Sequence, residues 1–185
     1  MSTLTGRAGT ALLVVDVQVD VVAGAHDRDG VVARIASLVD RARREGCPVV
    51  WVRHSDEELV TGSEGWNIVD GLTPTPEEPV VDKRFGDAFE ETDLGNVLDG
   101  LGASRLVVCG AQTEWCIRST LHGAMAHGYD AVLVSDAHTT TDATHEGVDL
   151  PAAAVIALTN RYWGWHSVPG RSTGAEPAAA VALTD

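Results

Sequence analysis

The chain has 185 residues, 44% of them hydrophobic, a length that supports one sizeable core and does not call for a second domain. We therefore expect a single domain over residues 1–185. Its 27 acidic and 13 basic residues give a formal net charge of −14, which disfavours a nucleic-acid partner. The N-terminal residues lack the apolar run of a secretory signal, and no stretch reaches the ~20 apolar residues that span a membrane. The sequence predicts a cytoplasmic protein with no membrane partner.

Short Val-rich apolar runs recur along the chain, each bounded by Gly, Pro or a charged residue, and this pattern is typical of strands buried on both faces. Helical periodicity or capping signals appear between and after them. The alternation predicts crossover units and a parallel sheet. The predicted strands are residues 11–16, 48–53, 79–83, 105–110 and 130–136, and the predicted helices are residues 30–46, 93–103, 114–128 and 146–162.

Two stretches do not fit this alternation. Residues 54–79 carry Gly, Pro and acidic residues with little periodicity, and they are longer than an ordinary connection, which favours a functional loop or lid. Residues 174–185 are rich in Ala. We expect this tail either to pack on a partner subunit or to fray.

The three cysteines are an odd number, and none belongs to a C-x-x-C pair, so neither a disulfide framework nor a zinc knuckle is indicated. Cys47, at a helix-to-strand connection, is expected to be structural. Cys109 lies inside an apolar strand, where burial keeps a thiol inert. Cys116 lies just beyond that strand, in the first turn of a predicted helix, where unpaired backbone N–H groups stabilise a thiolate. Cys116 is therefore the candidate nucleophile.

Polar residues end two other predicted strands. Asp16 closes the first strand, and Lys83 closes the third. Ligands of an open parallel sheet collect at the carboxyl ends of the strands, so these residues and Cys116 are expected at one edge. A lysine there would lower the pKa of the thiol, and a carboxylate would accept its proton and later return it to a leaving group. Taken singly, each residue also has a structural interpretation, as a cap, a surface charge or a small buried side chain.

Metal binding is the competing interpretation for the histidines. His54 ends the second strand and offers two ligands together with Asp56, but a third ligand at suitable spacing is missing. We therefore favour a polar role in the pocket and expect no metal. His138, in a segment rich in Ser, Thr and Asp, is expected to be structural.

The turn that starts at Gly110 is too short for a phosphate-binding loop, and no dinucleotide or P-loop motif occurs, so no cofactor is expected. A thiolate that attacks an acyl carbon needs donors for the developing oxyanion. The backbone N–H groups around Gln112 and Cys116 are the candidates for this oxyanion hole.

The ordered pattern of these residues resembles the isochorismatase-like cysteine hydrolases, which include nicotinamidases, N-carbamoylsarcosine amidohydrolase and streptothricin hydrolases. The resemblance covers nearly the whole chain. It implies an Asp16, Lys83 and Cys116 triad on an α/β three-layer, Rossmann-like fold, with a six-stranded parallel sheet and helices on both faces. The segments that carry it are 11-ALLVVDVQVD-20, 79-PVVDKRFGDAF-89 and residues 108–140, which begin VCGAQTEWCIRST.

The resemblance implies further features. One is a cis peptide bond between Ala111 and Gln112, which turns the Gln112 amide toward the substrate oxygen. Phe89 and Trp66 are expected to line the pocket, and Trp163 to do so from a partner subunit. The family also implies a homodimer or homotetramer.

The sequence departs from the nicotinamidase branch of this family. That branch carries an Asp-x-His element and a second His as a metal site, whereas residues 53–62 here read RHSDEELVTG, so nicotinamide is disfavoured. Some isochorismatases lack the cysteine and cleave a vinyl ether, so Cys116 favours cleavage of a C–N bond. The sequence thus predicts hydrolysis of a small amide, lactam or carbamoyl compound through a thioester. The alternatives are an isochorismatase-type hydrolase of another small molecule and a catalytically silent binding protein; a redox role lacks a resolving cysteine.

Overall fold

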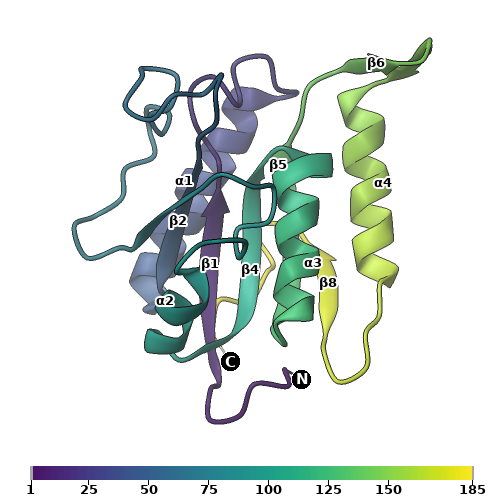
Figure 1. The fold of residues 1–185 in the computed structure, drawn as a ribbon. Helices are drawn as coiled ribbons and strands as arrows, with labels where there is room; N and C mark the ends of the chain where they lie inside the picture. Colours follow the sequence, from purple (N-terminus) through teal and green to yellow (C-terminus); the bar gives the residue numbers. More distant parts are fainter. Residues whose placement is uncertain (1, 185) are drawn as a thin grey trace.

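A computed structural model describes residues 2–184 of the chain as a parallel sheet between two layers of helices (Figure 1). The strands of this sheet are β1 (Gly9–Val15), β2 (Val49–His54), β3 (Val80–Lys83), β4 (Ala103–Ala111), β5 (Asp130–Thr139) and β8 (Thr173–Glu176). The helices are α1 (Arg28–Glu45), α2 (Leu94–Gly100), a π-helical turn η1 (Thr113–Ile117), α3 (Arg118–Ala126) and α4 (Ala152–Trp165). A small hairpin, β6 (Ala143–His145) and β7 (Val148–Leu150), precedes α4.

The strand order is β3-β2-β1-β4-β5-β8, and every pair is parallel, which confirms the expected six-stranded parallel sheet. The chain runs outward from β1 in one direction through β2 and β3, and then returns to the other side of β1 with β4. Val15, the last residue of β1, pairs with Val52 on one side and with Gly110 on the other. This reversal makes the carboxyl ends of β1 and β4 the place where a doubly wound sheet opens a crevice.

Each face of the sheet has its own apolar core, because successive residues of a strand point to opposite faces. Leu12 and Val14 of β1 face the layer formed by α1, whereas Leu13 and Val15 face the layer of α2, α3 and α4. Both faces of β1 are buried, which explains why its sequence is continuously apolar.

Two sequence-based expectations about the C-terminal third are wrong. The last helix begins at Ala152, later than predicted, because residues 143–150 form the β6–β7 hairpin. The Ala-rich tail does not fray over its described residues, up to 184, and its packing on a partner subunit stays a prediction. Its first residues belong to β8, which pairs with β5, and Val181 and Leu183 are buried in the core beside α1.

The connection between β2 and β3, residues 55–79, is irregular as predicted, but it is anchored to the sheet. The side chain of Gln18, which is fully buried, donates to the backbone oxygens of His54 (2.9 Å) and Trp66 (2.8 Å). Its Oε1 accepts the backbone N–H of His54 at 2.7 Å. One amide thus joins the end of β1, the end of β2 and the middle of the loop.

Within residues 2–184, none of the helices combines the length and the apolar character needed to cross a bilayer.

Candidate active site

The structure brings Asp16, Lys83 and Cys116 together at the carboxyl edge of the sheet. Asp16 directly follows β1, Lys83 ends β3, and Cys116 lies in η1 just after β4. Lys83 Nζ is 2.7 Å from Asp16 Oδ2 and 3.1 Å from Cys116 Sγ. The parallel register therefore gathers three residues that are 67 and 33 positions apart in sequence into one contact cluster.

Asp16 is a buried carboxylate on an unusual backbone. Its side chain is 1% exposed, and its φ of 51° lies in the left-handed region, which non-glycine residues adopt at a cost of about 1–3 kcal/mol. Burial raises the pKa of this carboxyl, and the charge of Lys83 opposes the rise. Besides Lys83, this carboxylate has the thiol of Cys116 as a hydrogen-bond partner. It is therefore available to take a proton from a thiol or a substrate.

Lys83 is held from several sides. Besides Asp16 and Cys116, its ammonium donates to the backbone oxygen of Phe85 at 3.0 Å and lies 3.3 Å from His54 Nδ1. Burial works against the ammonium form, but the charge of Asp16 and the hydrogen bonds to Asp16 and Cys116 raise its pKa. Lys83 thus remains cationic, and the ion pair with Asp16 compensates the burial of both charges.

The protonation state of Cys116 differs from the one expected. Burial raises the pKa of this thiol to about 12; Asp16 adds to the rise, and Lys83 opposes it. The expectation of a lowered pKa was wrong because burial and the Asp16 charge outweigh the lysine. The raised pKa favours the neutral thiol in the free protein, and a thiolate forms when a base takes its proton.

The turn that carries Cys116 is built by tight packing of β4 against β1. The Ala111–Gln112 peptide bond is cis, as the family resemblance implied. Gly110 has a φ of 124°, and a Cβ at this position would lie 1.9 Å from the backbone oxygen of Val15, so only glycine fits. The Gln112 carbonyl accepts the N–H groups of Trp115 (3.1 Å) and Ile117 (3.2 Å). The backbone amides of Gln112 and Cys116, in and beside this turn, remain the candidate oxyanion donors.

A second polar network supports the same turn from behind. Thr113 Oγ1 lies 2.8 Å from Nδ1 of the buried His138, whose Nε2 lies 3.0 Å from Asn160 Oδ1. Asn160 Nδ2 donates to the backbone oxygen of Ser135, which fixes the orientation of its amide. Nε2 of His138 must therefore carry the proton, and Nδ1 accepts from Thr113. The structural role expected for His138 is confirmed, but its two partners were missed because neither is near it in sequence.

The three aromatic residues expected in the pocket lie elsewhere. Phe89 is buried and stacks on the ring of His127, with centroids 4.7 Å apart. Trp66 lies beneath the guanidinium of Arg53, and Trp163 is 1% exposed within the core of its own chain, not at a partner's site. These expectations are wrong because large apolar rings were buried in the core. Trp115, which the sequence analysis passed over, is the aromatic residue that lines the pocket.

The cluster opens into a cleft of about 880 Å³, large enough for a small organic molecule. Asp16, His54, Gln112 and Cys116 line it together with Gly86. The remaining lining is acidic or apolar and consists of Asp20, Val21, Asp56, Glu58, Leu59 and Trp115.

The residues that could form the alternative metal site differ between the sequence-based interpretation and the structure. His54 Nε2 and Asp56 Oδ2 contact each other at 3.0 Å. The donor atoms that cluster are instead those of Asp16, His54 and Cys116, all within 4.8 Å of one another, in the part of the chain described. The ammonium of Lys83 lies in contact with all three, and this positive charge opposes a cation at the same place.

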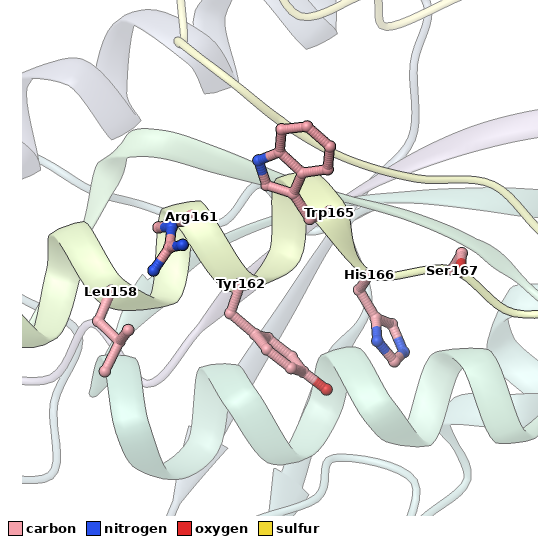
Figure 2. A pocket seen from close by; sticks show the side chains of 6 residues that line it. All are labelled: Leu158, Arg161, Tyr162, Trp165, His166 and Ser167. Carbon is pink, nitrogen blue, oxygen red and sulfur yellow. The ribbon is translucent and has the colours of Figure 1, made fainter.

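A second hollow, of about 650 Å³, lies on α4 and contains none of the triad residues (Figure 2). Tyr162 and His166 stack along it with centroids 5.2 Å apart, and Trp165 projects from the helix and is largely exposed. The expected homo-oligomer stays a prediction.

Comparisons with known proteins agree with this geometry. Residues 10–157 match the family model described as the isochorismatase domain. A streptothricin hydrolase from Streptomyces noursei is 37% identical over 159 residues, which are 83% of this chain and 60% of that protein. A ureidoacrylate amidohydrolase from Methylobacterium radiotolerans is 30% identical over 203 residues, covering 86% of this chain and 76% of that protein.

Among solved structures, an isochorismatase from Pseudomonas putida superposes with a TM-score of 0.85 at 28% identity, covering 97% of this chain and 94% of that one. The chain spans only about 60% of the length of the streptothricin hydrolase that it matches. The family model nevertheless covers most of the chain, and the fold agrees over nearly its whole length. The chain belongs to the isochorismatase family.

Proposed function

We propose that the protein is a cysteine hydrolase that cleaves a C–N bond of a small amide, lactam or carbamoyl compound through a thioester. The observation that carries this proposal is the position of the Lys83 ammonium, in contact with both the buried carboxylate of Asp16 and the thiol of Cys116. These are a base, a cation and a nucleophile around one cleft. The names of the amide-cleaving relatives, streptothricin hydrolase and ureidoacrylate amidohydrolase, support the same class.

In the first half of the reaction, the thiol proton moves from Cys116 to Asp16 as sulfur attacks the carbonyl carbon. Because the pKa of the thiol is raised, Asp16 must take its proton for the sulfur to attack as a thiolate. Lys83 remains charged and stabilises the developing thiolate. The oxyanion of the tetrahedral intermediate accepts hydrogen bonds from the backbone amides of Gln112 and Cys116.

In the second half, the intermediate collapses with loss of the amine, and Asp16 gives its proton to the departing nitrogen. The carboxylate so restored takes a proton from a water molecule, which attacks the thioester. The carboxylic acid leaves and the thiol is regenerated by the proton from Asp16. The raised pKa of Asp16 suits both directions of this transfer, because it makes the carboxylate a stronger base than an exposed aspartate.

The test is release of ammonia or amine from a panel of small amides, ureas and lactams. Cys116→Ala should abolish release while the circular dichroism spectrum and the thermal midpoint stay close to those of the wild type. Cys109→Ala is the matched control, because it removes the other cysteine of the same segment, which is fully buried. Equal loss of turnover in the two variants would contradict the assignment of the nucleophile.

A catalytically silent binding protein gives a different result. It would show alkylation of Cys116 but no turnover on any panel member, by wild type or variant.

A further inference from the structure

The mouth of the cleft carries a concentration of negative charge. Asp20, Asp56 and Glu58 line it and are exposed, and they come from the loop after β1 and the loop after β2. Beneath them lies Asp16, 1% exposed, which lines the cleft together with Cys116. The candidate catalytic residues Asp16 and Cys116 form the bottom of the cleft, and the three exposed carboxylates at its mouth influence which ligands enter.

Two of these rim carboxylates contact the backbone of the loop between β2 and β3. Asp56 Oδ1 accepts the backbone N–H groups of Glu58 (2.8 Å) and Leu59 (2.7 Å), so its carboxylate stabilises the turn in which it lies. Asp20 packs against Gly65, where an added Cβ would lie 1.8 Å from its Oδ2. Loop backbone therefore holds two of the three carboxylates at the rim.

Little positive charge balances the rim. Among residues 2–184, neither Asp20 nor Glu58 forms an ion pair with a lysine or arginine, and the charged-group contact of Asp56 is with His54. Lys83 is already paired with Asp16. The adjoining hollow that shares Asp56 adds Arg84, but also Asp82 and Glu91.

Trp115 completes the rim. The residue is 65% exposed although it is next to Cys116, and it lines the same cleft as the three carboxylates. An exposed indole beside carboxylates is a combination that suits an organic cation, because the ring face attracts positive charge while the carboxylates pair with it.

We propose that the substrate is cationic, with an ammonium or guanidinium group that the Asp20, Asp56, Glu58 and Trp115 rim holds while the amide reaches Cys116. This inference rests on the proposed C–N hydrolysis and specifies its substrate class. The rim attracts a cation before binding and repels an amide that carries a carboxylate.

The first experiment compares amides of one shape and three charges: β-alaninamide, butyramide and succinamate. The value of kcat/KM should be highest for the ammonium compound and lowest for the carboxylate, by about tenfold between the two, since each exposed charge contributes a factor of about two to three. The preference should shrink as salt is added. If butyramide and succinamate are hydrolysed with the same kcat/KM as β-alaninamide, the inference is overturned and the proposed hydrolysis stands.

The second experiment needs no substrate. Methanethiosulfonates with aminoethyl, methyl and sulfonatoethyl groups form a mixed disulfide with Cys116 and release methanesulfinate, so their rates report the charge of the cleft. Rates are normalised to a small free thiol, and Cys116→Ala gives the background. The aminoethyl reagent should react about tenfold faster than the sulfonatoethyl reagent.

Variants assign this preference to the rim. Asp20→Asn with Glu58→Gln should reduce the ratio of the two rates about four- to ninefold, a factor of about two to three for each charge removed. Glu77→Gln is the control, an exposed acid in the segment before β3 and so at the opposite edge of the sheet. An unchanged ratio in the double variant, or an equal reduction in Glu77→Gln, overturns the inference. Because this readout is independent of turnover, it decides the inference even where no amide of the set is hydrolysed.

Discussion

Two buried polar networks meet at the turn that carries Cys116, and one of them is charged whereas the other is neutral. The network on the cleft side centres on Lys83 and holds an ion pair with Asp16. The network on the other side centres on His138, between Thr113 and Asn160. Burial lowers the pKa of His138, so that this network is neutral. Proton transfer needs the charged network, whereas the neutral one supports the turn without competing for the proton.

The largest effect is expected from removing Lys83, the centre of the charged network. Lys83→Met leaves Asp16 buried and without its cation, which should cost about 3–5 kcal/mol in the free energy of unfolding. Turnover should fall roughly 10³-fold or more, because members of a catalytic set act as a unit. The measurement is urea denaturation together with amide hydrolysis.

The double variant Lys83→Met with Asp16→Asn is the control. It removes both charges and should recover most of the stability and none of the activity. The pH dependence adds a check, because without Lys83 the pKa of Asp16 is raised further. The instability of Lys83→Met should therefore shrink at acidic pH, where the carboxyl is protonated in both states, and grow as pH rises. Additive losses in the double variant would show that the two side chains are not coupled.

His138→Leu breaks the neutral network at a lower cost. It leaves the buried hydroxyl of Thr113 without its acceptor, which should destabilise the protein by about 2 kcal/mol. The loss of turnover should be about tenfold or less, because His138 positions the turn and does not touch the substrate. Addition of Thr113→Val to His138→Leu should recover part of the stability. A loss of activity as complete as that of Lys83→Met, in a folded protein, would place His138 in the chemistry.

Cys109 tests a residue that belongs to neither network. It is fully buried on β4, and burial alone raises the pKa of its thiol. Cys109→Ala removes one packed sulfur atom and should cost about 1 kcal/mol of stability with turnover unchanged. Thermal denaturation and a saturating amide assay measure the two quantities. A loss of turnover without loss of stability would show that Cys109 has a role beyond packing.

The smallest expected effect is a pH dependence of stability. The folded-state pKa of His138 is lowered, so the unfolded chain binds more protons below the ordinary histidine pKa of about 6.5. The stability that His138 contributes is complete above that pH and is lost as pH falls toward the folded pKa. His138→Gln should therefore flatten the decline of unfolding free energy between about pH 7 and pH 5. A wild-type slope retained in His138→Gln would assign it to other groups, such as His122, whose pKa is also lowered by burial.

The sequence predicted the parts of the site that local patterns determine. Asp16, Lys83 and Cys116 each follow or end a buried apolar run, and parallel register then places them at one edge. The π-helical turn, the partners of His138 and the net pKa of Cys116 depend on contacts between distant segments, which spacing alone does not report. β8 was missed because a four-residue strand with Gly and Glu lacks the apolar run that marks the others.

The aromatic residues show the same limit. Trp66, Phe89 and Trp163 looked like pocket residues by family resemblance, but packing buried them, whereas Trp115 stayed exposed. Exposure of a ring is decided by the layers of helices around the sheet and not by its neighbours in sequence.

The Gln18 amide has a consequence for how a substrate enters. Its hydrogen bonds to His54 and Trp66 add to the main-chain hydrogen bonds between residues 17–20 and the long loop, in a position that water does not reach. To swing the loop aside, the protein would have to expose these groups without new partners. The middle of the segment that was expected to act as a lid is therefore anchored to the sheet and should not move as a lid. The His54 amide proton should exchange with deuterium as slowly as those of the central strands, and entry should involve rearrangement only at the loop's outer rim.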